Sequence, residues 1–313
     1  MPRKKYKINT NDKAYSFESS SFYKLSSPNI LANLLHIPLA DLKKLKNSKD
    51  SYKPFVIKKE GKKDRTIECP KRLLEKVHTR IASLLCRIIT PDFLHSGIKG
   101  RTYITNAKSH LGKHKVLTSD LRSFYPSTSK KMIFKLFRYN FHCSVEVADL
   151  IASVATYEEH LPTGSRLSMP LALWANIEMF LEIESLAKKH SINMTIYVDD
   201  LVFSGKNLNE LFSSTVNKIV LKHGHEIHSG KTVLYKSDEI KLITGVIVHN
   251  DEIFIRNCHH QNMHNDLEEW KTYKNGFMVP DDLKSRLLGR INAFAQIDPR
   301  LKDKARSILA IEH

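Results

Sequence analysis

The spacing of apolar residues along the chain changes repeatedly between a helical period and the alternation of a strand. Helical spacing predicts helices at 30–37, 71–89, 130–137, 145–154, 171–189 and 208–223, followed by a mostly helical, basic part from about 261. β-Branched and aromatic residues predict a hairpin at 52–67, a strand at 115–120, a hairpin at 194–204, and strands at 233–235, 240–243 and 246–248. No repeat or low-complexity linker separates these elements, so we expect one continuous body.

The composition indicates the class of partner. The chain has 313 residues, of which 41% are hydrophobic, enough to bury a core. Its 50 Lys and Arg residues exceed its 33 Asp and Glu residues, which gives a formal net charge of +17 at pH 7. Such a charge attracts a polyanion, so nucleic acid is the leading partner class, although basic proteins also bind membranes or simply stay soluble.

Two observations argue against other classes of protein. No run of about 20 apolar residues is present, and the basic first residues are followed by polar ones. We therefore expect no membrane span, no signal peptide and a location inside the cell. The cysteines are scattered without a CxxC pair, which argues against a disulfide framework and a structural zinc site: Cys69, Cys86, Cys143 and Cys258.

Three acidic residues carry the most chemical information. Asp120 ends a predicted strand, and Asp199-Asp200 lies at the turn of a predicted hairpin. Two strands of one antiparallel sheet can bring such carboxylates together, where they repel unless cations neutralise them. Mg²⁺ suits this position, and two ions stabilise the attacking and leaving oxygens of phosphoryl transfer. The pattern predicts a nucleotidyl transferase, although Asp199-Asp200 alone also fits an exposed turn and Asp120 alone a helix N-cap.

The residues around the acidic pair, Tyr197-Val198-Asp199-Asp200, resemble the YxDD signature of reverse transcriptases. Other blocks follow the order of that family between about 52 and 250: a basic hairpin with 65–67, then 120–127, 161–164 and 229–232. The resemblance implies an α+β right-hand polymerase with fingers, a palm of antiparallel sheet plus helices, and a helical thumb. The implied parts are an N-terminal helical extension at 1–50, fingers at 51–118, palm at 119–235, and palm end, primer grip and thumb at 236–313.

Two further blocks resemble those of the bacterial retron reverse transcriptases. The run from Asn106 to His110 matches their NAxxH pattern, and Ile243-Thr244-Gly245 resembles their VTG block. Taken singly, Asn106 also fits a turn cap, His110 a buried structural residue, and Thr244-Gly245 a bulge. The resemblance implies a cytoplasmic bacterial enzyme that copies a cognate structured noncoding RNA into a short DNA (msDNA) linked to that RNA, beside an effector protein in antiphage defence.

The resemblance also assigns roles to single residues. Asp120 and Asp199 are expected to coordinate two Mg²⁺ ions, with Mn²⁺ as a substitute, and Asp200 to support them. The residues expected to contact the incoming deoxynucleoside triphosphate are Lys63, Arg65, Tyr125, Gly164 and Lys231. The residues expected to contact RNA are Asn106, His110, Thr244, Gly245, Arg286 and Arg290, the last two in a basic thumb.

The chemistry of the side chains supports the nucleotide contacts that the resemblance implies. Arg65 and Lys63 match phosphate oxygens, Tyr125 excludes a ribose 2′-hydroxyl, Gly164 lets the backbone come close to the template or the new base pair, and Lys231 protonates the leaving pyrophosphate. Plainer alternatives are a solvated hairpin tip, a core aromatic, a tight loop and a surface lysine. If the chain curls into a turn after Asp120, we expect the neighbouring Phe124, and not the tyrosine, in the core.

One loop departs from the family pattern. Thr163 stands where Gln is usual, and 165–170 replaces the common APTSP run, which bears on template handling and fidelity. The alternatives to a retron enzyme are another bacterial reverse transcriptase, of the defence-associated or intron type, and an inactive RNA-binding protein. The three intact aspartates argue against the inactive protein, and the short chain argues against an intron enzyme.

Overall fold

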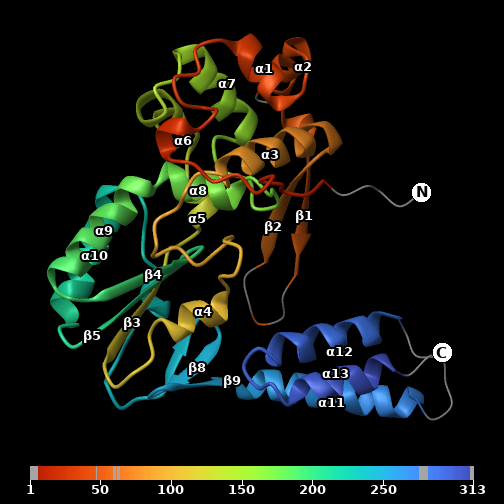
Figure 1. Cartoon of the computed structure of the whole chain (residues 1–313). Helices are drawn as coiled ribbons and strands as arrows, with labels where there is room; N and C mark the ends of the chain where they lie inside the picture. The colour runs from red at the N-terminus through yellow and green to blue at the C-terminus, as the bar shows by residue number, and fades with distance from the viewer. Residues whose placement is uncertain (1–5, 47, 59–60, 62–63, 275–280, 311–313) are drawn as a thin grey trace. The chain divides into compact units, whose positions relative to one another are not determined.

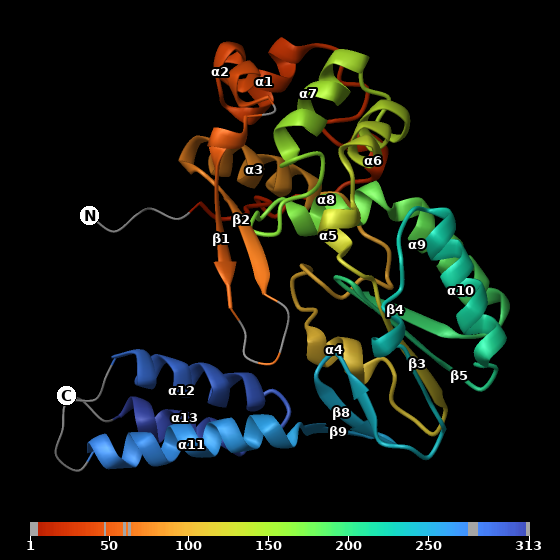
Figure 2. The same ribbon diagram turned by 180° about the vertical axis from the view of Figure 1, so that it is seen from behind.

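The computed structural model describes residues 6–46, 48–58, 61, 64–274 and 281–310 (Figures 1 and 2). The chain forms two compact units, each built from three separate segments. Unit 1 comprises Met1–Asp92, Asp120–Leu186 and Ser214–Ser229, and unit 2 comprises Phe93–Ser119, Ala187–Ser213 and Gly230–His313. This division by contacts is not the same partition as fingers, palm and thumb, whose boundaries at 50, 118 and 235 remain a prediction.

Unit 1 is mainly helical. Its elements are η1 (Phe17–Ser19), α1 (Pro28–Leu35), α2 (Leu39–Leu45), η2 (Lys49–Ser51), α3 (Arg72–Leu85), α5 (Phe124–Ser127), α6 (Lys130–Lys135), the π turn η3 (Leu136–Asn140), α7 (Val145–Ala155), α8 (Ser168–Ala175) and most of α9 (Ile177–Lys189) and α10 (Glu210–Lys222). Strands β1 (Tyr52–Ile57) and β2 (Arg65–Pro70) pair antiparallel, with Tyr52 opposite Pro70. The predicted hairpin at 52–67 is therefore confirmed.

An aromatic cluster forms much of the core of unit 1. Phe22, Phe137 and Phe141 are fully buried, and the rings of Phe137 and Phe141 stack with centroids 5.2 Å apart. Offset stacking and edge contacts of this kind add about 0.5–1.5 kcal/mol per pair beyond the burial of apolar area. Because these residues come from the N-terminal segment and from the end of η3, they connect parts of the chain that are more than 100 residues apart.

Unit 2 contains two sheets. The first, in the order β4-β5-β3-β6, comprises β3 (Lys115–Asp120), β4 (Asn193–Tyr197), β5 (Asp200–Gly205) and β6 (Val233–Tyr235). The second, in the order β7-β8-β9, comprises β7 (Lys241–Ile243), β8 (Val246–His249) and β9 (Glu252–Ile255). A buried cluster with residues from α4 (Tyr103–Lys108), β3, β5, β7 and β8 joins the two sheets. The core of this unit therefore fixes where the strand ends lie.

Three helices follow the second sheet. They are α11 (Asn257–Lys274), α12 (Asp281–Phe294) and α13 (Leu301–Leu309), and in Figure 2 they lie side by side. Apolar side chains recur along each helix at helical spacing, and Trp270, Leu287 and Ile308 meet in one buried cluster. The expected helical C-terminal part is confirmed, and it begins at Asn257 and not near 261. No helix within the described ranges is long and apolar enough to cross a membrane.

Several local predictions need correction. The helix expected over 171–189 is two helices, because Asn176 ends α8, where its side chain donates to the carbonyl oxygen of Ala172. The sequence did not predict α4, α5 or β9 either. The helices α4 and α5 have six and four residues, which is too short for a helical apolar pattern to register.

Three buried histidines are held in the neutral form. His78 lies between Ser165 Oγ and Val154 O, at 2.7 and 2.9 Å, and burial lowers its pKa to about 4. Burial also lowers the pKa of His110 to about 3 and that of His225 to about 4. Since an unfolded chain restores an ordinary pKa near 6.5, the unfolded state binds protons that the folded state does not.

We predict that the free energy of unfolding falls as the pH is lowered from 6.5 towards 4. Each of the three histidines contributes up to about 1.4 kcal/mol per pH unit in this window. Urea titrations at pH 7 and pH 5 measure the effect, since most carboxylates titrate below that range. His264→Gln, at an exposed position, serves as the control and should leave the slope unchanged. A stability that stays constant from pH 7 to 5 would contradict the neutral assignment.

Candidate functional site

The turn between β4 and β5 carries the acidic pair. Tyr197 lies opposite Asp200, so Val198 and Asp199 form a two-residue hairpin turn, as predicted. Val198 has a φ of +62°, a conformation that β-branched residues rarely adopt and that hairpin turns usually give to glycine. The Val198 N–H donates to Ser96 Oγ at 3.1 Å. The strand register and this bond hold a strained backbone in place directly before Asp199.

Asp120 ends the neighbouring strand. In the first sheet β3 lies between β5 and β6, so the strand that ends at Asp120 is next to the strand that begins at Asp200. Beyond the strand, the Asp120 carbonyl oxygen accepts from the His228 N–H at 2.8 Å, which fixes the backbone at the end of β3. All three aspartates are half-buried. The sheet therefore places the two acidic blocks on adjacent strands.

The donor type of these residues fits Mg²⁺. Carboxylate oxygens are hard ligands, and Mg²⁺ in phosphoryl-transfer sites is held by one or two carboxylates together with substrate phosphates. Within the part of the chain that the structure describes, no group of three or more His, Cys, Asp or Glu side chains is arranged to hold a metal ion. Asp120, Asp199 and Asp200 are therefore not grouped as a set of three metal ligands, and their role in binding Mg²⁺ remains a prediction.

The NAxxH block lies beneath the acidic hairpin. His110 Nδ1 is 2.7 Å from Ser204 Oγ, and His110 Nε2 is 2.7 Å from Thr195 Oγ1, so one imidazole bridges β5 and β4. Asn106 Nδ2 donates to Thr244 Oγ1 at 3.4 Å, which connects the two retron-like blocks. Asn106 and His110 are fully buried. Any effect of these two side chains on RNA must therefore pass through the residues that they hold.

The Ile243-Thr244-Gly245 block forms a tight turn and not a bulge. Ile243 lies opposite Val246, which leaves Thr244 and Gly245 as the two turn residues between β7 and β8. Both have positive φ, +45° and +85°, which is the pattern of a type I′ turn, and glycine adopts it without strain. Thr244 Oγ1 donates to Tyr103 O at 2.9 Å. Gly245 is exposed and remains the accessible part of this predicted RNA contact.

The loop with Gly164 is locked onto β2. The Thr163 N–H donates to Glu68 Oε2 at 3.1 Å, and Thr163 Oγ1 donates to Thr66 O at 2.8 Å. A Cβ added to Gly164 would lie 2.8 Å from Glu68 O, closer than real Cβ atoms approach. Thr163, where the family has Gln, therefore acts as a hydroxyl bridge to the strand that begins with Arg65. Gly164 is required by its close approach to the β2 backbone, which fits the plainer alternative of a tight loop, and its approach to the template or the new base pair remains a prediction.

The other predicted nucleotide contacts are placed as follows. Phe124 is 5% exposed and its ring centroid lies 5.6 Å from that of His225, whereas Tyr125 is half-buried. The expectation that Phe124 belongs to the core is confirmed. Arg65 is exposed at the start of β2, and Lys231 is exposed at the end of η4 (Ser229–Lys231). Lys63 lies outside the described residues. The roles of these residues with nucleotide remain predictions.

The two thumb arginines, both in α12, make ion pairs with Asp266 of the neighbouring helix α11. Arg290 Nη1 lies 2.6 Å from Asp266 Oδ2, and Arg286 Nε lies 3.2 Å from Asp266 Oδ1. The Asp266 side chain is only 7% exposed, so these contacts are more than surface pairs and hold α12 against α11. RNA binding by Arg286 and Arg290 remains a prediction, to which the structure adds a role in the packing of the helices.

Sequence reasoning missed two supporting groups. Ser96 accepts the N–H of Val198 from a position 102 residues earlier, and no local pattern marks it. Glu68 binds both Thr163 and His160, the latter at 3.1 Å, and is buried behind the loop. A signal for Glu68 did exist, because a carboxylate directly after 65–67 on a half-buried strand requires a partner.

Comparisons with known proteins find relatives among the retron reverse transcriptases. No protein-family model matches the chain. The chain is 30% identical over 177 residues to the retron Se72 reverse transcriptase of Salmonella heidelberg, covering 56% of this chain and 46% of that protein. It is 23% identical over 209 residues to the retron Ec86 reverse transcriptase of Escherichia coli, covering 65% of each. The chain is a homologue of retron reverse transcriptases. It spans about half to two thirds of the length of these retron relatives.

A solved structure supports the fold class. Apo telomerase from Candida tropicalis has a TM-score of 0.50 with this chain at 11% identity, covering 77% of this chain and 51% of that one. A likeness at this identity shows the fold alone. This likeness, together with the mixture of helices and antiparallel sheets in the chain, confirms the predicted α+β polymerase fold.

We predict that Gly164→Ala lowers the free energy of unfolding by about 1–3 kcal/mol, because the added methyl group must push the loop off β2. Gly289→Ala is the matched control. It lies in α12, where an added Cβ meets nothing within 4 Å, and the better helix former should raise stability by up to about 1 kcal/mol. Urea denaturation of both variants tests this, and equal effects would contradict the tight contact at Gly164.

Proposed function

We propose that this chain is an RNA-directed DNA polymerase of the retron type, with a carboxylate site for two Mg²⁺ ions. The observation that carries the proposal is the pair of adjacent strands, one ending at Asp120 and the other beginning at Asp200 after a constrained turn. The homology to retron reverse transcriptases supports the same chemistry. Mn²⁺ would substitute for Mg²⁺, because it accepts the same oxygen ligands.

Each residue has a distinct task in the proposed reaction. Asp120 and Asp199 bind the cations, and Asp200 supports them from the adjoining strand. When bound, Mg²⁺ supplies the charge that stabilises the attacking 3′-oxygen and the leaving pyrophosphate. Arg65, with Lys63, orients the triphosphate through charge-assisted hydrogen bonds. Tyr125 excludes a ribose 2′-hydroxyl, and Gly164 makes room for the base pair. Lys231 donates a proton to the leaving pyrophosphate.

The proposed template is a cognate structured noncoding RNA. The product would be a short single-stranded DNA joined to that RNA, made from deoxynucleoside triphosphates in the bacterial cytoplasm, with an effector protein as partner in antiphage defence. The exposed Gly245 turn and the basic face of α12 and α13 are the RNA contacts that we propose, because positive charge and shape dominate recognition of structured RNA.

We predict that Asp199→Asn abolishes DNA synthesis while leaving the fold intact, because the substitution keeps the size of the side chain and removes the charge that binds the cation. The assay extends a DNA primer on an RNA template with the purified chain. Asp238→Asn, which removes an exposed carboxylate after β6, is the control and should retain full activity. Synthesis by the Asp199 variant at the control rate would contradict the site.

A cellular experiment tests the retron assignment separately. The chain is expressed with its native upstream noncoding DNA, and total nucleic acid is examined for a branched RNA–DNA molecule whose RNA part is sensitive to RNase. The product should disappear in the Asp199→Asn variant. Primer extension in vitro without any branched product would indicate a bacterial reverse transcriptase of another class. Inactivity in both assays would favour an RNA-binding protein.

A further inference from the structure

A basic cavity of about 260 Å³ lies in unit 1, where the segment before η1 and the end of α1 meet one face of α3. Helices α1 and α3 are labelled in Figure 1. Its cationic lining residues are Lys7, Lys76, Arg80 and Arg87. The described residues that line it include neither Asp nor Glu. We call this cavity the Arg80–Arg87 pocket, and its lining favours an anion.

The walls of the pocket are fixed by hydrogen bonds. On α3 the lining positions 76, 80 and 83 recur at helical spacing, so they share one face, and Arg87 follows shortly after the helix. The Asn9 N–H donates to Ser83 Oγ at 3.0 Å, and the Tyr15 N–H donates to the carbonyl oxygen of Arg87 at 3.0 Å. The N-terminal segment is therefore fastened along α3, and the pocket is preformed for a ligand.

Among the residues that the structure describes, no carboxylate forms an ion pair with the cations of the pocket. Arg87 is 7% exposed, and its Nε atom has no hydrogen-bond partner among the described residues. Burial, and then the positive charge of Arg87, lower the pKa of the Arg80 guanidinium. A buried charge without a counter-ion is strongly unfavourable. An anion between the two guanidinium groups would remove this repulsion and satisfy the unpaired donor.

A purely structural role explains only part of the cluster. Lys76 Nζ donates to His36 O at 3.1 Å, and Arg80 Nε donates to Leu34 O at 2.9 Å. Both bonds satisfy carbonyl groups at the C-terminal end of α1, where cations are favoured. The side chain of Arg87 makes no such bond in the described part of the chain. Capping of α1 therefore accounts for Lys76 and Arg80 but not for the buried Arg87.

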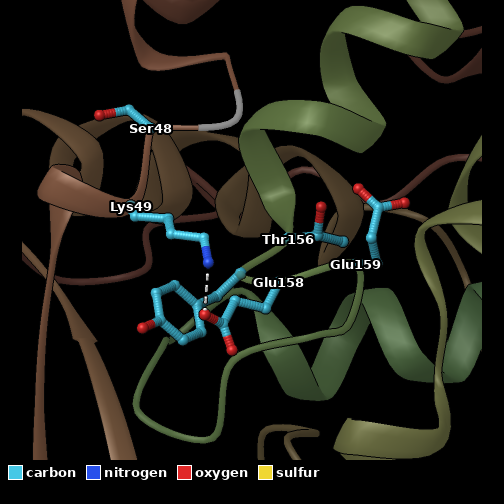
Figure 3. A pocket seen from close by; sticks show the side chains of 6 residues that line it. Ser48, Lys49, Thr156, Glu158 and Glu159 are labelled. Carbon is cyan, nitrogen blue, oxygen red and sulfur yellow. Dashed lines mark hydrogen bonds and ion pairs between the residues drawn. The ribbon is translucent and has the colours of Figure 1, made fainter.

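A second cavity in the same unit provides a contrast. It has a volume of about 480 Å³ and is lined by Lys49 together with Glu158 and Glu159. Figure 3 shows the Lys49 side chain reaching the carboxylate of Glu158, with Nζ and Oε1 2.7 Å apart. Here the lysine already has its counter-ion, and the carboxylates would repel an anion. The Arg80–Arg87 pocket differs because its described lining contains no carboxylate to pair with the cations.

We propose that the Arg80–Arg87 pocket binds a phosphate group, with Arg80 and Arg87 as its principal donors and Lys7 and Lys76 beside them. Guanidinium groups match the geometry of phosphate oxygens and hold them through paired, charge-assisted hydrogen bonds. The hydroxyl and amide side chains of Thr79, Ser83 and Asn9 add polar lining that suits an anion and not an apolar group. This inference goes beyond the proposed polymerase activity and does not depend on it.

Thermal unfolding in inorganic phosphate tests the proposal. We expect the unfolding midpoint of the wild type to rise with phosphate concentration, compared with chloride at equal ionic strength. Arg87→Gln should lose this rise while unfolding, without phosphate, at the wild-type temperature or above, because it removes an uncompensated buried charge. Loss of a merely structural contact would lower that temperature. An equal phosphate response in wild type and Arg87→Gln overturns the proposal.

Two further variants keep the test decisive. Lys44→Gln/Lys49→Gln removes two positive charges from lysines that are 78% and 72% exposed and lie outside the pocket, so it should respond to phosphate like the wild type. If Arg87→Gln does not fold, Lys7→Gln at the exposed edge of the pocket takes its place, and it should need at least about threefold more phosphate for the same rise. An unchanged response in Lys7→Gln then overturns the proposal.

A second measurement identifies the source of the phosphate. Binding of a single-stranded RNA oligonucleotide is followed by fluorescence anisotropy over a range of salt concentrations. If the pocket holds a backbone phosphate of the RNA, Arg87→Gln makes the slope of log K against log salt concentration shallower by about 0.7. The Lys44→Gln/Lys49→Gln variant measures how much of that change comes from the loss of positive charge alone. If RNA binding is unchanged but stabilisation by AMP is lost in Arg87→Gln, the bound phosphate belongs to a free nucleotide.

Discussion

The candidate site depends on the backbone of a single two-residue turn. Val198 adopts a conformation that its branched side chain disfavours, and it does so because the β4–β5 register and the hydroxyl of Ser96 hold its amide. Beneath the turn, His110 connects the same two strands through Thr195 and Ser204. Polar contacts within unit 2 thus hold the backbone that carries Asp199 and Asp200.

Buried polar residues also join the two retron-like blocks to each other. Asn106 and Thr244 join α4 to the turn between β7 and β8, so the block that precedes β3 and the block that follows β6 form one internal connection. In unit 1, Glu68 plays a comparable part by locking the loop at Thr163 onto β2. Removing one partner of such a contact leaves a buried polar group unsatisfied, which costs more than the bond itself contributes.

The sequence was sufficient for the acidic hairpin, because β-branched residues flank Asp199-Asp200 on both sides and the strand pattern is local. It assigned Gly164 to the template or the new base pair, whereas the close contact in the structure is with the backbone of β2. It did not predict the burial of Asn106, since a short helix such as α4 leaves too few positions for a periodic pattern. Nor did it identify Ser96 or Arg87, because their roles arise from contacts between segments distant along the chain or from a cavity that only the folded unit contains.

The central claim is that the constrained hairpin presents carboxylates to a divalent cation shared with a nucleotide. The most direct measurement is Mn²⁺ binding by electron paramagnetic resonance, with and without a deoxynucleoside triphosphate, for the wild type and Asp120→Asn/Asp199→Asn. We expect the wild type with nucleotide to bind more Mn²⁺ than protein and nucleotide bind separately, and the double variant to lose this excess. An equal excess in both proteins would contradict the account.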